Sequence, residues 1–212
     1  MCCGDILGIG PEPEKTVKRI MMLNGKIECV RGNHEEYLIN GIPKKVPNDE
    51  IMDYEEIEHY KWEHSQLSAE SVSFIKSLPY SKTIVIENKK IYMAHYSMNC
   101  DNKYVNYKPC PTLNDLDNMF QNVEAYIVIY GHNHNASVNR NADKLYINSG
   151  SLGCPAGAYM GANAGILDIE GDNINYEQLI VTYDVNKVVD IIRKKKYPDY
   201  KNILLYFYGV NK

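Results

Sequence analysis

The chain has 212 residues, of which 44% are hydrophobic, and a formal net charge of -4. A chain of this length can bury one substantial hydrophobic core, and nothing in its composition demands a second domain. The mild acidity argues against a surface that neutralises an extended nucleic-acid backbone or an anionic membrane. A small phosphate-bearing ligand is not excluded, because bound metal ions can supply positive charge that a count of side chains misses.

The cysteines and the N-terminal sequence predict the compartment. Six cysteines, at positions 2, 3, 29, 100, 110 and 154, form no C-x-x-C pair and no regular disulfide framework. The first residues contain no basic region followed by an apolar run, and no later apolar stretch approaches the roughly 18 residues of a membrane span. We therefore expect reduced cysteines and a cytoplasmic protein without a membrane partner.

The first predicted elements lead to a polar cluster. A helix is expected after Pro11 and Pro13, because apolar residues follow at helical spacing and end near Gly25. A strand is expected over residues 26–30. It runs directly into Arg31-Gly32-Asn33-His34, and residues 35–39 continue as a helix.

Residues 42–80 differ from the rest in their density of charged and aromatic side chains. A helix is expected over residues 68–78, with Ser68 as its N-cap. The stretch is a candidate lid over the mouth of a site. His59 and His64 lie in a polar helical segment beside Trp62, a setting that favours a solvated face or a lid over metal binding.

The middle of the chain repeats the order of strand and then polar cluster. Residues 82–87 and 90–94 predict a hairpin that ends at His95-Tyr96-Ser97. Tyr96, next to His95, is a candidate substrate neighbour. A helix is expected over residues 114–123, and a buried strand over residues 125–130 opens into Gly131-His132-Asn133-His134.

Two further hairpins and a helix complete the prediction. The hairpins join residues 136–139 to 144–148 and residues 165–169 to 174–181, and apolar residues from Val185 to Ile192 mark the helix. Strands alternating with helices indicate an α/β or α+β domain. We find no internal repeat and no low-complexity linker, so residues 1–212 are expected to form a single domain.

Four clusters carry Asp, Asn or His after an apolar run. They are Gly4-Asp5, Gly32-Asn33-His34-Glu35, Ala94-His95 and Gly131-His132-Asn133-His134. Because side chains leave the core where strands end, we expect these clusters to meet at one sheet edge. Imidazole, carboxylate and amide ligands suit Zn, Mn or Fe better than Ca or Mg.

Such ligands match the chemistry of phosphoester hydrolysis. Two metal ions about 3.5 to 4 Å apart can clamp a phosphate and activate a hydroxide. Asp5 is a candidate carboxylate bridge between the ions. An imidazole that binds no metal can protonate the leaving oxygen, and His34, beside the candidate ligand Asn33, is the natural choice.

In their order along the chain these clusters resemble the motifs of the calcineurin-like metallophosphoesterases, and so does Asn148-Ser149-Gly150-Ser151-Leu152-Gly153. The resemblance implies an α/β fold of two packed mixed β-sheets flanked by helices, a four-layer αββα sandwich. It implies that Asp5 bridges two metals. Asn33, His95 and His132 would then complete one metal site and His134 would belong to the other, while His34 would bind phosphate and act as the catalytic acid.

The sequence departs from the family pattern at its N-terminus. Members of that family begin with a strand that ends in an Asp-x-His motif, and no such motif precedes Gly4-Asp5 here. We therefore expect an N-terminally incomplete domain that lacks the first strand and helix. Asp5 and His134 would be the remaining ligands of the second metal, and the chain would bind two divalent ions or only one.

The leading hypothesis is a metal-dependent phosphoesterase that acts on phosphodiesters, phosphomonoesters or nucleotide anhydrides. Its partner would be a phosphate-ester small molecule or a nucleotide. The alternative is a catalytically impaired, one-metal binding or regulatory relative, and the metal content separates the two. A protein phosphatase would use the same site chemistry, since pocket loops rather than metal ligands choose among phosphoesters.

Overall fold

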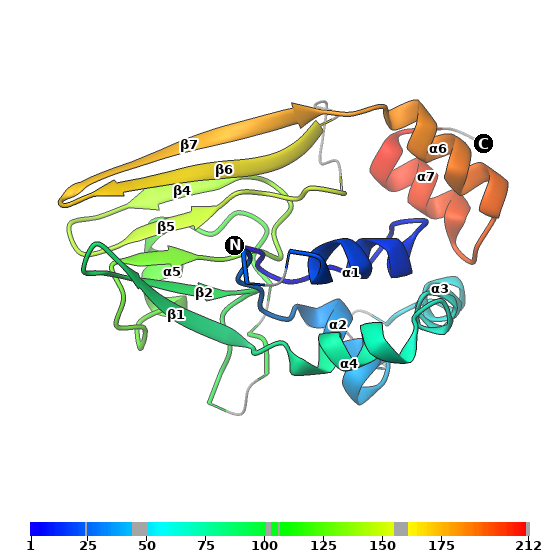
Figure 1. Ribbon diagram of the computed structural model, residues 1–212, viewed down its shortest axis with the longest axis horizontal. Helices are drawn as coiled ribbons and strands as arrows, with labels where there is room; N and C mark the ends of the chain where they lie inside the picture. Colours follow the sequence, from blue (N-terminus) through cyan, green and yellow to red (C-terminus); the bar gives the residue numbers. More distant parts are fainter. Residues whose placement is uncertain (24, 44–50, 101–102, 106, 155–160, 211–212) are drawn as a thin grey trace.

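The computed structural model describes residues 1–23, 25–43, 51–100, 103–105, 107–154 and 161–210. Strands gather at one end of the molecule and most helices at the other (Figure 1). The elements in chain order are α1 (Pro13–Met21), α2 (Asn33–Asn40), α3 (Tyr54–Ser65), α4 (Ala69–Ser77), β1 (Ser81–Ile86), β2 (Lys89–Ala94), α5 (Leu113–Met119), β3 (Ile127–Ile129), β4 (Ser137–Arg140), β5 (Leu145–Asn148), β6 (Gly161–Glu170), β7 (Asn173–Thr182), α6 (Val185–Lys195) and α7 (Tyr200–Tyr208).

The larger sheet has five strands in the order β1-β2-β3-β5-β4. The three central strands β2, β3 and β5 run parallel, whereas β1 and β4 pair antiparallel at the two edges. Parallel strands end at the same edge of a sheet, so the residues that follow β2 and β3 are brought together. The site lies at this edge, facing the helices.

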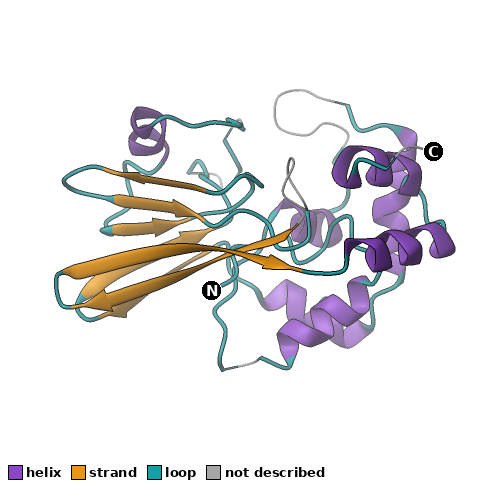
Figure 2. Ribbon diagram, turned by 90° about the horizontal axis from the view of Figure 1, so that it is seen from above, coloured by secondary structure: helices purple, strands orange, loops and turns teal. Residues whose placement is uncertain are grey.

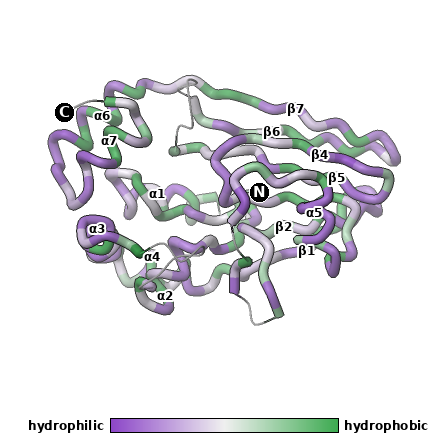
Figure 3. The backbone as a smooth tube through the Cα atoms, turned by 180° about the vertical axis from the view of Figure 1, so that it is seen from behind, coloured by the Kyte–Doolittle hydropathy of each residue, from purple (hydrophilic) through white to green (hydrophobic). Residues whose placement is uncertain are grey.

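Each face of the five-stranded sheet has its own hydrophobic cover. On one face, residues such as Ile91, Ile127 and Ile147 pack against side chains of the β6–β7 hairpin, including Leu167 and Tyr176. On the other face, aromatic side chains pack against Leu116 of α5. Figure 2 shows a helix beside the strands at this end of the molecule. Exposed and half-buried residues alternate along the first part of β7, and its hydrophobic residues gather toward the end that leads to α6 (Figure 3).

Most of the predicted elements are present. The N-cap of α4 is Ser68, whose side chain accepts a hydrogen bond from the Ser71 backbone N–H at 3.2 Å, and the hairpin before His95 forms as β1–β2. Two sheets pack face to face with helices around them, which confirms the predicted α/β fold. No helix of the described residues is long and apolar enough to cross a bilayer.

Two predictions about elements need correction. The strand expected over residues 26–30 is reduced to one parallel bridge between Cys2 and Cys29, because little of the neighbouring chain pairs with it. The helix α7 was not predicted. Its sequence, YKNILLYFY, ends in an unbroken apolar run from Ile203 to Tyr208, and such a run lacks the periodicity that identifies a helix.

The expected lid over residues 42–80 stays a prediction, and residues 44–50 lie outside the described residues. The described part of this stretch contains α3, which packs against α2. The prediction of a solvated face is wrong for His59, because only 3% of this residue is exposed. Its ring lies between the carbonyl oxygens of Gly8 and Pro198, at 2.9 and 3.2 Å.

Candidate metal centre

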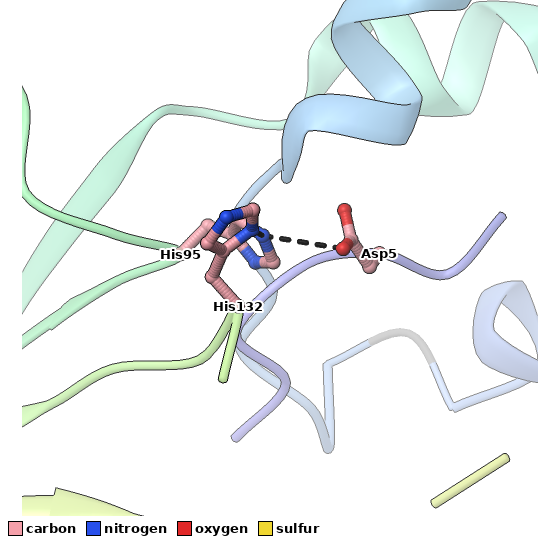
Figure 4. A group of neighbouring side chains, drawn as sticks. All are labelled: Asp5, His95 and His132. Atoms are coloured by element: carbon pink, nitrogen blue, oxygen red, sulfur yellow. Dashed lines mark hydrogen bonds and ion pairs between the residues drawn. The ribbon is translucent and has the colours of Figure 1, made fainter. Parts of the chain in front are cut away.

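Four of the predicted ligands converge at the carboxyl edge of the five-stranded sheet. His95 directly follows β2, and His132 lies three residues after β3. Asp5 comes from the loop before α1, and Asn33 is the first residue of α2. In Figure 4 the rings of His95 and His132 lie together and face the carboxylate of Asp5.

The donor atoms of these four side chains lie close together. The Nε2 of His95 lies 3.0 Å from the Oδ1 of Asn33, 3.1 Å from the Nδ1 of His132 and 3.2 Å from the Oδ2 of Asp5. The Nδ1 of His132 lies 3.0 Å from the same Asn33 oxygen. We call these four side chains the donor cluster.

These separations match the geometry of a metal site. A tetrahedral ion with bonds of about 2.0 Å holds its donor atoms about 3.3 Å apart. The donor cluster has almost this spacing, with two imidazoles, one carboxylate and one amide oxygen. Among the described residues, Asp5, His95 and His132 form the one group of His, Cys, Asp or Glu side chains close enough to hold a metal ion.

The orientation of the His95 ring leaves its Nε2 free to bind a metal. Its Nδ1 donates a hydrogen bond to the Cys3 carbonyl at 2.7 Å. Because a carbonyl only accepts, the proton of the neutral ring is on Nδ1, and Nε2 presents its lone pair to the donor cluster. The His95 carbonyl in turn accepts a hydrogen bond from Gly131 N–H at 2.8 Å, which joins the two strand ends.

Unusual backbone conformations place two of the ligands. Asp5 and His132 have φ angles of 52° and 66°, in the left-handed region that residues other than glycine rarely occupy. Gly32 is required by the close approach of the loop, since a Cβ there would overlap the carboxylate of Asp5. Gly32 is therefore required by the packing of the loop, independently of the ligand Asn33 that follows it.

Glu35 holds the loop that carries Asp5. Its carboxylate is fully buried and accepts hydrogen bonds from the backbone N–H groups of Gly32 at 2.6 Å, Asp5 at 2.8 Å and Leu7 at 2.9 Å. These bonds join α2 to the loop before α1. The sequence predicts no role for Glu35, because it does not show which N–H groups the carboxylate meets.

The charges of the donor cluster depend on one another. Burial opposes ionisation of Asp5, yet His95 and His34 hold the pKa of its carboxyl well below its usual range. Burial also disfavours the charged form of His95, but Asp5 raises the pKa of that ring. Burial and the neighbouring His95 lower the pKa of His132 to about 3, so His132 is neutral and its lone pair is available to a metal.

His34 lies beside the donor cluster rather than in it. Its Nε2 lies 3.8 Å from the Oδ2 of Asp5, and its backbone N–H donates to Oδ1 of the same carboxylate at 3.2 Å. The rings of Tyr37 and Tyr60 lie against it, with centroids 5.7 and 5.4 Å away. This placement suits an imidazole that contacts a substrate without binding metal.

His134 lies apart from the four ligands and has a partner that the sequence does not predict. The Sγ of Cys154 lies 3.0 Å from the Nδ1 of His134, and the thiol is buried. Burial lowers the pKa of His134, which keeps the ring neutral. Only the position of Cys154 after the Ser149-Gly150-Ser151 turn hinted that it would come near the site.

The aromatic residues around His132 also differ from expectation. Tyr96, predicted as a substrate neighbour, is a core residue with 1% exposure, and its ring packs against that of His132 at a centroid distance of 5.0 Å. Tyr107 contacts His132 edge-on at 4.9 Å and is only partly buried. Of the two tyrosines, Tyr107 is the more exposed.

The sequence matches a family of known proteins over most of its length. The family is described as the calcineurin-like phosphoesterase superfamily domain, and the match covers residues 1–172. The matched range contains the donor cluster, His34 and His134. It ends in the turn between β6 and β7.

Individual relatives have low sequence identity to this chain. The uncharacterized protein MJ0912 of Methanocaldococcus jannaschii is 28% identical over 214 residues, which covers 94% of this chain and 82% of that protein. The hypothetical protein PH1004 of Pyrococcus horikoshii has a similar structure, with a TM-score of 0.78 and 16% identity over 99% of this chain and 84% of that one. A metallophosphoesterase of Sphaerobacter thermophilus gives a TM-score of 0.69 and 19% identity over 98% and 86%. At these identities the two structures support the fold alone.

Proposed function

The chain belongs to the calcineurin-like phosphoesterase superfamily, and from this premise we propose that it is a metal-dependent phosphoesterase. Its substrates would be phosphodiesters, phosphomonoesters or nucleotide anhydrides. The observation that carries the proposal is the donor cluster, in which His95 Nε2 lies 3.0 to 3.2 Å from donor atoms of three other side chains. This close spacing of two imidazole nitrogens, a carboxylate and an amide oxygen supports a shared cation.

Asp5, Asn33, His95 and His132 would hold one divalent ion, of the Zn, Mn or Fe class. Asp5 and His134 would contribute to a second. When bound, such ions neutralise the charge of the phosphate oxygens and lower the pKa of water, so that a nucleophile is available near neutral pH.

The side chains around the ions have separate tasks. His34 would protonate the leaving oxygen, since its Nε2 lies beside the donor cluster and ligates nothing there. Asn33, at the start of α2, places its amide oxygen in the donor cluster, and the positive end of the helix favours a bound phosphate. Tyr107 would border the substrate next to His132.

The test is an assay of the purified chain with Mn²⁺. Bis-p-nitrophenyl phosphate and a dinucleoside polyphosphate are the substrates, and His132→Ala is compared with Asn135→Ala, an exposed residue of the same loop. We expect turnover that requires metal, survives in Asn135→Ala and is lost in His132→Ala. Turnover that resists chelation, or that His132→Ala retains in full, would reject the proposal.

A second function is favoured by one observation. The ring of His134 contacts Cys154 and is outside the donor cluster, so the one-ion centre is the better formed of the two. A one-metal binding or regulatory protein is therefore the alternative. Elemental analysis after metal loading separates the two: about two ions per chain with turnover supports the enzyme, and one ion without turnover supports the alternative.

A further inference from the structure

Three buried polar atoms near His34 have no hydrogen-bond partner within the part of the chain that the structure describes. They are the Nδ1 of His34, the Oε2 of Glu63 and the Nε2 of His64. A buried polar atom without a partner costs about 1–3 kcal/mol, so unpaired atoms usually have an explanation. These atoms are the unpaired buried side-chain atoms found in the described residues, and the rings of His34 and His64 both lie against that of Tyr60.

The loop before α1 connects these atoms. The Gly8 N–H donates to Oε1 of Glu63 at 2.6 Å, and Glu63 is only 1% exposed. A Cβ built on Gly8 would lie 3.9 Å from the Nδ1 of His34. Gly8 therefore has the carboxyl group of Glu63 at its N–H and the ring of His34 beside its α-carbon.

The helix α3 forms the wall behind His34. The ring of Tyr60 lies 5.4 Å from that of His34 and 6.5 Å from that of His64, between centroids. Glu63 and His64 follow Tyr60 on the same helix. Only the ring of Tyr60 therefore separates His64 from the ring of His34, which lies beside Asp5.

We propose that Glu63 is a positioning residue for His34 and acts through an ordered water held by Glu63, His64 and His34. Buried waters typically make about three hydrogen bonds to groups that otherwise lack a partner. The water would accept from the Nδ1–H of His34 and from the protonated Oε2 of Glu63, and donate to Nε2 of His64. This arrangement fixes the rotation of the His34 ring and keeps its Nε2 turned toward Asp5 and the substrate.

A metal ion does not fit this position as well as water. Among the described residues, donor atoms close enough to hold an ion occur in the group of Asp5, His95 and His132, and the three unpaired atoms form no such group. A water bridges donors that are farther apart than metal ligands. The role of Glu63 toward His34 rests on the proposed function, but the bridging water does not.

The first test is therefore independent of activity. A high-resolution crystal structure of the wild-type chain is compared with that of Glu63→Gln, which keeps a hydrogen-bonding group of nearly the same shape. We expect electron density for a water within about 3.2 Å of all three atoms in both proteins. A dry pocket, direct contacts among the three side chains, or a metal ion in that place would overturn the proposal.

The second test separates positioning from general stability. In Glu63→Ala we expect kcat to fall about tenfold with an unchanged KM and metal content. The loss should be larger for a phenyl ester than for the p-nitrophenyl ester, because the poorer leaving group depends more on protonation by His34. Glu63→Gln should restore most of the rate.

The matched control is Glu55→Ala, which removes an exposed carboxylate from the same helix. It should leave both esters unaffected. An equal loss with the two esters in Glu63→Ala, or a loss of bound metal, would mean that Glu63 serves the fold and does not position His34. If the wild-type chain has no turnover, the proposed function fails, and the crystal structures still decide whether the water is present.

Discussion

On one side of the candidate site the sheet delivers His95 and His132 from the ends of β2 and β3, whereas on the other side α3 supplies Glu63 and His64. The sheet side is fully paired. His95 Nε2 lies 3.0 to 3.2 Å from donor atoms of the other three side chains, and the Gly131 N–H donates to the His95 carbonyl and so joins the two strand ends. The helical side leaves Glu63 Oε2 and His64 Nε2 without partners. Parallel strands place side chains at a shared edge, whereas the unpaired atoms of α3 are those that we propose a water to bridge.

The largest expected effect comes from removing the charge of the sheet side. Asp5→Asn keeps the size of the side chain but removes the only carboxylate of the donor cluster. We expect the affinity for Mn²⁺ to fall on the order of a thousandfold, measured by calorimetry after chelator treatment. The control Asp168→Asn removes an exposed carboxylate from β6 and should bind normally. Unchanged affinity in Asp5→Asn would place the metal elsewhere.

The next prediction tests whether the close approach of the loop and α2 is essential to the sheet side. In Gly32→Ala the new Cβ would overlap the Asp5 carboxylate, so one segment must move. We expect the free energy of unfolding to fall by about 3 kcal/mol in urea. Gly10→Ala is the control, because no atom lies within 4 Å of the added carbon. Equal stability of the two variants would show that the loop adapts freely.

A smaller effect is expected at the edge of the sheet side, where His134 meets Cys154. If the thiol holds the ring of a metal ligand, Cys154→Ala should weaken binding of the second ion about tenfold and leave the first unchanged. Cys110→Ala, which removes an exposed thiol, is the control. Titration with Co²⁺, followed by its absorption spectrum, measures the two events. If binding of the first ion is weakened equally, Cys154 serves the fold alone.

The smallest effect concerns the helical side and its pH dependence. Burial raises the pKa of Glu63 from 4.5 to about 8, so the folded chain binds this proton more tightly than the unfolded chain. Its contribution to stability is complete below pH 4.5 and is lost as the pH rises to 8. Between pH 6 and pH 7 the wild type should lose about 1 kcal/mol relative to Glu63→Gln, measured by urea unfolding in the presence of a chelator. A constant difference between the two proteins would mean that Glu63 titrates normally.

The difference between the two sides also decided what the sequence could predict. Asp5, Asn33, His95 and His132 each follow or precede an apolar run at a motif glycine or strand end, so their meeting was predictable. The β1–β2 hairpin was predictable for the same reason. Strand periodicity and strand order are local signals, and they determine which residues leave the sheet at one edge.

The helical side had no comparable signal. His59 lies in a helix rich in charged residues, and its burial results from contact with the loop at Gly8 and with Pro198, far along the chain. Glu35 and Cys154 were missed because their partners are backbone groups and a ring brought near only by the fold. Tyr96 was placed beside a substrate because it follows His95, although alternation along an extended chain turns adjacent side chains to opposite sides.

The central claim is that Asp5, Asn33, His95 and His132 form a metal centre. The most direct measurement is anomalous X-ray scattering from crystals of the chain soaked in Mn²⁺. We predict a manganese peak about 2.0 to 2.3 Å from the donor atoms of all four side chains. A map with no peak there, or with its manganese bound at other residues while the donor cluster stays as described, would contradict the account.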